Sequence, residues 1–172
     1  NITSVAREWH TVVETISEDS KLVIIDDGSK DSTYQVLTEL SKELPQLEVI
    51  TKKNSGHGAT VLYGYRYALE QNADYIFQTD SDGQTLPEEF YGFWELRDKY
   101  SAVIGYRNHR KDGFSRVFVT KTLKFVLWCI FKLNITDANT PFRLLNRDVL
   151  QRHISKIPKD FNLSNVMLTI CL

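Results

Sequence analysis

Two aspartates, Asp80 and Asp82, stand one residue apart in the segment QTDSDGQT, after a short apolar run and directly before a glycine. Side chains alternate along an extended chain, so both carboxylates would lie on the same side of it. Two carboxylates supply part of the octahedral oxygen shell that Mg²⁺ or Mn²⁺ prefers, and oxygens of a diphosphate and of water can complete that shell. The metal would offset the negative charge that develops on a diphosphate leaving group. The spacing therefore predicts a divalent metal site with Asp82 and Asp80 as ligands.

The same segment has two other interpretations. One is a simple acidic turn, and the other is a calcium-binding EF-hand loop that starts at Gln78. In that register Asp80, Asp82 and Glu89 take the third, fifth and twelfth positions of the loop. A glutamine at the first position, Pro87 inside the loop and a strand instead of a helix before it all argue against calcium.

Asp26 and Asp27 end the apolar run KLVIID, which is rich in β-branched residues. Such a run is typical of a strand that is buried on both faces. Carboxylates at its end can accept hydrogen bonds from a ribose hydroxyl or a base N–H, so both residues are candidate ligands of a nucleotide. The alternative is that Asp27 or Ser29 only caps the following helix.

The loop KKNSGHGATV places Gly56, His57 and Gly58 at the predicted start of a helix. Backbone N–H groups and the helix dipole make such a start an anion site, although loop glycines also serve simply as turns. The loop is part of the G-x-G-x-x-G pattern of dinucleotide-binding folds, which keeps an NAD(P)-linked oxidoreductase as an alternative. Val61 stands where that pattern needs its third small residue, which argues against the alternative.

Basic side chains gather after the strand predicted at 101–105. Arg107, Arg110 and Arg116, with Lys111 among them, could bind phosphate or an anionic acceptor through forked hydrogen bonds. Arg143 in the segment DANTPFR could join them. The alternative is a basic loop that contacts only water.

The pattern of apolar residues predicts the elements that position these groups. Strands are expected at 21–26, 47–51, 74–79 and 101–105, and helices at 2–17, around 36–44, around 61–69 and over 87–94. Strands that alternate with helices are typical of an α/β fold with a mostly parallel sheet flanked by helices. Ligands of such sheets bind at the carboxyl ends of the strands. The four polar loops that follow the strands, DDGS, NSGHG, DSDG and GYRNHR, should lie together there.

The pattern changes after residue 113. Residues 116–133 predict an apolar helix, 137–147 a loop that enters a short strand, and 147–157 a further helix. The apolar helix can be buried in the protein or can lie on a membrane or a lipid. Its short length and its lysines, Lys121 and Lys124, favour burial.

The composition is that of one globular domain of 172 residues, with 42% hydrophobic and 25% charged residues. A net charge of −1 gives no electrostatic reason to expect nucleic acid as a partner. No apolar run is long enough to span a bilayer. Cys129 and Cys171 are expected to be buried, reduced thiols of a cytoplasmic protein.

Taken together, the segments VIIDDGSKDST, KNSGHGAT, IFQTDSDGQ, GYR and DANTPFRLL resemble the family 2 glycosyltransferases of the GT-A fold, over about residues 1–150. The later segment is most similar to the branch that includes dolichyl- and polyprenyl-phosphate sugar synthases. The resemblance implies a UDP- or GDP-sugar donor, a Mg²⁺ or Mn²⁺ cofactor and transfer with inversion to a polyprenyl-phosphate or saccharide acceptor. It also implies a role in cell-envelope or surface glycan synthesis, at the cytoplasmic face of the membrane.

The resemblance also assigns roles to residues. Asp27, with Asp26 beside it, matches the aspartate that reads the base, Asp82 the main metal ligand, and Asp80 the residue that faces the ribose or the sugar. A saccharide hydroxyl acceptor needs a general base, for which Asp137 is the candidate, with a loop-capping role as the alternative. A polyprenyl phosphate is already anionic and would depend instead on the four arginines, Arg107, Arg110, Arg116 and Arg143.

Two departures from the family pattern bear on activity. The family opens with a strand that helps to hold the nucleotide, and this chain is expected to be a single domain trimmed at both ends that lacks this strand. Asn165 stands roughly where the synthase branch has a glutamate. A nucleotide-sugar-binding domain without activity is therefore a further alternative. Within the domain, 1–105 is expected to form the nucleotide-sugar-binding half and 106–172 the acceptor-side half.

Overall fold

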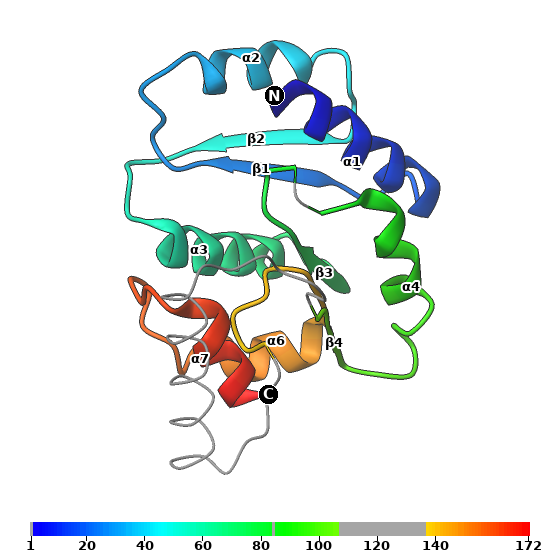
Figure 1. Ribbon diagram of the computed structural model, residues 1–172, viewed down its shortest axis with the longest axis vertical. Helices are drawn as coiled ribbons and strands as arrows, with labels where there is room; N and C mark the ends of the chain where they lie inside the picture. The colour runs from blue at the N-terminus through cyan, green and yellow to red at the C-terminus, as the bar shows by residue number, and fades with distance from the viewer. Residues whose placement is uncertain (1, 84, 107–136) are drawn as a thin grey trace, which may run out of the picture.

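The computed structural model describes residues 2–83, 85–106 and 137–172 (Figure 1). Its strands are β1 (Leu22–Asp26), β2 (Leu47–Thr51), β3 (Tyr75–Gln78), β4 (Ala102–Ile104) and β5 (Arg143–Asn146). Its helices are α1 (Ile2–Ile16), α2 (Thr33–Leu40), α3 (His57–Glu70), α4 (Phe90–Trp94), α6 (Arg147–Ile154) and α7 (Ser164–Cys171), with the short 3₁₀ helix η1 (Pro87–Glu89) before α4.

These elements confirm the strands and helices that the apolar pattern predicts within the described residues. The structure has one further helix among the described residues, α7, which the apolar pattern does not predict. The apolar segment 116–133 and three predicted phosphate ligands, Arg107, Arg110 and Arg116, lie outside the described residues.

The strands form two sheets. In the first, β1 and β2 are parallel, with Leu22 opposite Leu47 and Asp26 opposite Thr51. In the second, β5 lies between β3 and β4 and is antiparallel to both. The α/β class is confirmed, and β5 adds antiparallel pairing to a sheet that was expected to be mostly parallel. Because β3 and β4 both oppose β5, they are parallel to each other.

Helices α1 and α3 cover opposite faces of the β3–β5–β4 sheet. The ring of Trp9 on α1 lies 5.6 Å from that of Phe77, whereas Leu62 on α3 packs in one cluster with Ile76 and Leu145. Neighbouring residues of a strand point to opposite faces, so Ile76 and Phe77 turn toward different helices. Each fully buried apolar side chain of this kind contributes about 1.5–3 kcal/mol to folding.

The same two helices also contact β1, and Figure 1 shows α1 and α2 on one side of β1 and β2, with α3 on the other. The two sheets therefore form one layer between α1 and α3. Within the described ranges, β1 pairs only with β2 and β3 pairs only with β5, so each keeps one edge without a neighbouring strand.

Candidate functional site

The candidate site lies at the carboxyl edge, defined here as the edge where β1 to β4 end and β5 begins. Arg143, the first residue of β5, is opposite Gln78 of β3 and opposite Ile104 of β4. The loop that enters β5 therefore lies beside the loops that leave β3 and β4. This antiparallel arrangement brings Asp137 to the same edge as the predicted nucleotide and metal ligands.

Asp27 connects the loops that follow β1 and β2. Its carboxylate accepts hydrogen bonds from the backbone N–H groups of Ser55 at 3.0 Å and Gly56 at 2.9 Å, and it forms an ion pair with Lys52. Gly56 is the N-cap of α3 and has a φ of 87°, a left-handed conformation that favours glycine. In this structure, the anion at the predicted anion site of α3 is therefore the carboxylate of Asp27.

The contacts of Asp27 make its carboxylate a stronger acid. Burial alone raises its pKa, but hydrogen bonds from Lys52 and Ser55, together with the charge of Lys52, outweigh burial and leave the pKa below its ordinary value. The side chain is still 21% exposed. The carboxylate is therefore accessible to solvent in part, and its role as a nucleotide ligand stays a prediction.

Asp26 is buried and serves the turn that follows β1. It accepts hydrogen bonds from the Thr51 hydroxyl at 2.8 Å and from the backbone N–H of Ser29 at 3.2 Å. Burial raises the pKa of Asp26, yet these hydrogen bonds more than compensate, and the pKa lies below its ordinary value. Gly28, within the turn, has a φ of 73°. Both carboxylate oxygens of Asp26 thus accept hydrogen bonds from the protein itself. The role of Asp26 as a direct nucleotide ligand stays a prediction.

Asp80 and Asp82 lie in the loop after β3. The Nε2 atom of His57, at the start of α3, lies 4.0 Å from Oδ1 of Asp80, so this loop and the α3 loop approach each other. The hydroxyls of Thr79 and Thr85 are 2.8 Å apart and draw the two ends of the loop together. Asp80 is partly exposed and Asp82 is exposed. The EF-hand interpretation is wrong, because residue 78 belongs to a paired strand and no helix precedes the loop.

The donor atoms of this loop suit the predicted metal. Within the described parts of the chain, no three His, Cys, Asp or Glu side chains are grouped to hold a metal ion. Two carboxylates accessible to water fit a hard cation that takes its other oxygen ligands from a diphosphate and from water. Asp80 and Asp82 as metal ligands stay a prediction.

Gly58 has a packing role rather than a binding role. A Cβ atom at this position would lie 2.2 Å from the backbone oxygen of Asn162 and 2.5 Å from that of Phe161. The segment before α7 thus packs directly on the first turn of α3. Of the two glycines of the GHG motif, Gly56 contributes its N–H to the site, and Gly58 allows two backbones to meet.

Asp137 is partly exposed in the loop before β5, and its Oδ1 accepts a hydrogen bond from the backbone N–H of Asn139 at 3.3 Å. The loop-capping contact that the sequence offers as an alternative is therefore present. A role as general base stays a prediction, and it is compatible with this contact because a carboxylate has further lone pairs.

Arg143 does not have the surroundings expected of a surface phosphate ligand. The residue is fully buried, since β5 is the central strand of its sheet. Its guanidinium donates to the carbonyls of Thr140 at 2.5 Å and Asn165 at 3.2 Å and to the hydroxyl of Thr169 at 3.2 Å. In this structure the guanidinium faces the interior of the protein and not an anion at the surface.

Sequence reasoning missed two polar groups of the site, Lys52 and Thr51. They end β2 just as Asp26 and Asp27 end β1, and the parallel register places Thr51 opposite Asp26. Aligning the two runs LVIIDD and LEVITK in parallel, residues 22–27 with 47–52, would have found both residues. The signal was present in the sequence, but it required the pairing of the strands.

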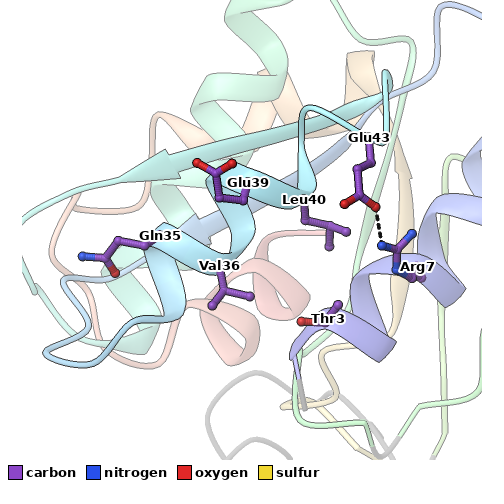
Figure 2. A pocket seen from close by; sticks show the side chains of 7 residues that line it. All are labelled: Thr3, Arg7, Gln35, Val36, Glu39, Leu40 and Glu43. Carbon is purple, nitrogen blue, oxygen red and sulfur yellow. Dashed lines mark hydrogen bonds and ion pairs between the residues drawn. The ribbon is translucent and has the colours of Figure 1, made fainter.

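A groove between α1 and α2 lies apart from these residues. Figure 2 shows the side chains that line it and the ion pair between Arg7 and Glu43 that joins the two helices. None of the predicted site residues lines the groove. Among the helices that the structure describes, none is long and apolar enough to cross a membrane.

Comparison with known proteins gives the family. The family model described as "Glycosyl transferase family 2" matches residues 2–154. The chain is 26% identical over 150 residues to the UDP-N-acetylglucosamine–dolichyl-phosphate N-acetylglucosaminyltransferase of Methanococcus voltae, a match that covers 76% of this chain and 60% of the relative. It is 27% identical over 141 residues to the undecaprenyl-phosphate mannosyltransferase of Micrococcus luteus, covering 77% of this chain and 57% of the relative.

A third relative is the undecaprenyl-phosphate 4-deoxy-4-formamido-L-arabinose transferase of Salmonella choleraesuis, 27% identical over 124 residues, or 70% of this chain and 37% of the relative. The chain thus spans 60% or less of the length of these relatives. The family match includes the GHGATV loop, which sets the oxidoreductase alternative aside. The α/β layers agree with the GT-A fold that the motifs imply. The chain belongs to glycosyl transferase family 2.

Proposed function

We propose that this domain transfers a sugar from a nucleotide-diphosphate donor to a polyprenyl-phosphate acceptor, with inversion and with the help of Mg²⁺ or Mn²⁺. The observation that carries the proposal is that the loops of Asp27 and Asp80 meet at the start of α3, at one edge of the sheets, in a chain of this family. Three similar proteins are named as transferases that act with dolichyl or undecaprenyl phosphate, which favours the lipid-phosphate class of acceptor.

The donor would bind across the loops that follow β1, β2 and β3. Asp27 would accept a hydrogen bond from the nucleotide, and Lys52 would stay close enough to balance its charge. Asp82 and Asp80 would hold the divalent ion, which supplies positive charge against the departing diphosphate. Asp26 would keep the Asp27 turn in place from below.

The transfer itself is a displacement. An acceptor oxygen attacks the anomeric carbon and forms a new C–O bond, while the bond to the diphosphate oxygen breaks and the nucleoside diphosphate leaves with the electron pair. A phosphate acceptor brings an anionic oxygen and releases no proton. The basic residues Arg107, Arg110 and Arg116 are proposed to bind this acceptor.

A saccharide hydroxyl is the second candidate acceptor, favoured by the partial exposure of Asp137 at the carboxyl edge. Such a hydroxyl must lose its proton during attack, and Asp137 would take it. We also propose that the domain works at the membrane surface, on the cytoplasmic side, because a polyprenyl-phosphate acceptor would be held there by its lipid chain.

Calorimetric titration of the full-length protein with UDP and GDP, each in the presence of Mn²⁺, tests the donor site. We expect one of the two to bind, and the Asp82→Ala variant to lose at least about tenfold in affinity because metal and diphosphate bind together. Asp19→Ala is the matched control, since Asp19 is an exposed aspartate just before β1, at the opposite edge of the sheet. Absence of binding, or binding that Asp82→Ala leaves intact, would refute the proposal.

Turnover then separates the acceptors and the inactive alternative. The full-length protein, a UDP- or GDP-sugar and a short-chain polyprenyl phosphate should yield the sugar–phosphate lipid. Product formed only with a saccharide would support the second candidate, and donor binding without any product would indicate a domain that binds nucleotide sugars without transferring them.

A further inference from the structure

The guanidinium of Arg143 gathers acceptors from two segments that are distant in sequence. Its Nε and Nη2 atoms donate to the Thr140 carbonyl, at 3.1 and 2.5 Å, and Nη2 also reaches the Ala138 carbonyl at 3.4 Å. Its Nη1 atom donates to the Asn165 carbonyl on α7 at 3.2 Å. One side chain therefore ties the loop before β5 to helix α7.

Thr169 makes a second connection between the same segments. Its hydroxyl lies 3.1 Å from the Ala138 carbonyl and 2.7 Å from the Asn165 carbonyl, and it accepts from Nη1 of Arg143 at 3.2 Å. The two carbonyls that Thr169 approaches are thus also bound by Arg143. The result is a small buried network whose members share acceptors.

The network fixes the residue next to Asp137. Ala138 is buried and packs with Val166 of α7, and its carbonyl meets both Arg143 and Thr169. Asp137 itself is partly exposed, and its carboxylate accepts a hydrogen bond from the backbone N–H of Asn139. The backbone that directly follows Asp137 is therefore held by Arg143, Thr169 and Val166.

Packing alone does not require an arginine at this position. The neighbouring β5 residues, Leu144 and Leu145, are buried and apolar, so this strand accepts apolar side chains. Burying a charged guanidinium costs several kcal/mol of lost hydration, which the hydrogen bonds of Arg143 must offset. These hydrogen bonds form only when the loop of residues 137–140 lies against α7, so the buried charge favours one conformation of that loop.

We propose that Arg143 and Thr169 are positioning residues, which hold the loop of residues 137–140 on α7 and thereby aim Asp137 at the acceptor side of the carboxyl edge. This inference rests on the second candidate of the proposed function, the saccharide acceptor, because only a hydroxyl acceptor needs Asp137 as a base. It replaces direct phosphate binding as the role of Arg143. Neither residue touches the reacting atoms, and both act through Asp137.

The test compares Thr169→Val, which removes the hydroxyl and keeps the shape, with Thr169→Ser, which keeps the hydroxyl. The full-length protein, a nucleotide sugar and a saccharide acceptor provide the assay, since a phosphate acceptor releases no proton that Asp137 could take. We expect kcat to fall about 10- to 100-fold in Thr169→Val, because displacement of a reacting group by about 1 Å has effects of this size. KM for the donor should stay unchanged, and Thr169→Ser should recover most of the rate.

A double-mutant comparison shows whether the effect passes through Asp137. In an Asp137→Asn background, Thr169→Val should cause no further loss of kcat, since misplacing an amide that no longer reacts costs nothing. A full additional loss in that background, or a Thr169→Val enzyme with normal kcat, would overturn the proposal. Normal kcat in Asp137→Asn itself would overturn it too.

Two further measurements keep the outcomes apart. Urea unfolding of each variant separates lost rate from lost folding, and Arg143→Lys serves as a second variant that keeps the charge but not the fork of donors. Asp82→Ala identifies a failure of the proposed function itself: if that variant keeps full activity, the metal-assisted transfer is wrong. If it is inactive while Thr169→Val is normal, only the positioning role is wrong.

Discussion

Asp27 and Arg143 organise two regions of the molecule by opposite chemistry. The Asp27 carboxylate gathers donors, namely the backbone N–H groups of Ser55 and Gly56 and the ammonium of Lys52. The Arg143 guanidinium gathers acceptors, the carbonyls of the loop before β5 and of α7. Each charge fixes backbone segments that no strand pairing holds.

The two residues differ in access to solvent. The side chain of Asp27 is 21% exposed, whereas Arg143 is completely buried. A partly exposed charge can exchange a partner for a ligand, whereas a buried one can do so only if the surrounding structure opens. The comparison teaches that two charged residues at the same edge of the sheets can differ completely in exposure, and this difference is why we propose a binding role for Asp27 and a positioning role for Arg143.

Replacing Arg143 by methionine should have the largest effect on stability. The variant removes the guanidinium donors from the carbonyls of Ala138, Thr140 and Asn165, and each buried acceptor left unpaired costs about 1–3 kcal/mol. Urea unfolding followed by tryptophan fluorescence measures the loss. The control is Arg152→Met, since Arg152 is exposed on α6. A loss for Arg143→Met as small as that of the control would mean that the buried network does not stabilise this region.

Gly58→Ala should have the next largest effect. The added methyl would lie 2.2 Å from a backbone oxygen of Asn162, so α3 or the segment before α7 must shift, at a cost of about 1–3 kcal/mol. Gly92→Ala is the matched control, because a Cβ there meets nothing within 4 Å and alanine favours a helix. Thermal unfolding should therefore show opposite shifts for the two variants, and equal shifts would contradict the packing role of Gly58.

Asp27→Asn should affect stability less but affect binding more. Asparagine keeps the size of the side chain and one acceptor oxygen but loses the ion pair with Lys52, which costs about 1–2 kcal/mol at a partly exposed site. Affinity for the nucleotide should fall at least about tenfold, because a charged acceptor binds roughly twice as strongly as a neutral one and the loop is less ordered. Calorimetry and urea unfolding measure the two effects, with Asp19→Asn as control. A larger stability loss than that of Arg143→Met would reverse the comparison between the two regions.

The sequence predicts the elements that depend on local pattern. Runs such as KLVIID identify strands because they are short, continuous and rich in β-branched residues, although Leu22 to Ile25 are only partly buried. The stripe on α1 identifies a helix because Ala6, Trp9 and Val12 face one side. It does not predict that β5 is antiparallel, because that depends on which strands are its neighbours. Helix α7 was missed because polar and apolar residues share its buried side, where Ser164 and Asn165 lie with Val166 and Leu168 and leave no separate apolar stripe.

The candidate site shows the same division. Polar residues at strand ends were found because their position follows from the strand itself. The burial of Arg143 was missed, since its acceptors include Asn165, which only the folded chain brings near. The packing role of Gly58 depends likewise on Asn162. Contacts between segments that are distant along the chain decide whether a residue binds or positions, and a single sequence carries no local sign of them.

Acidification should lower the free energy of unfolding through Asp26 and Asp27, by less than the substitutions above. The pKa values of Asp26 and Asp27 lie below their ordinary values in the folded protein, because hydrogen bonds from Ser29, Thr51, Lys52 and Ser55 outweigh the effect of burial. The folded pKa is thus below the unfolded pKa of about 3.9, so the unfolded chain binds more protons as the pH falls through this range. The stabilisation is fully present above the unfolded pKa and is lost as the pH falls through the folded pKa.

Urea unfolding at a series of pH values from about 6 to 3 measures this loss. Asp26→Asn cannot titrate at this position, so its stability should decline less steeply than that of the wild type below about pH 4. Asp19→Asn, at an exposed position, should follow the wild-type curve. Identical slopes for Asp26→Asn and the wild type would mean that the hydrogen bonds of Asp26 do not favour its charged form. The hydrogen bonds of the Arg143 network join a guanidinium, a hydroxyl and backbone carbonyls, none of which changes charge in this pH range. The contribution of these hydrogen bonds to stability should therefore remain at the acidic pH at which that of Asp26 and Asp27 is lost.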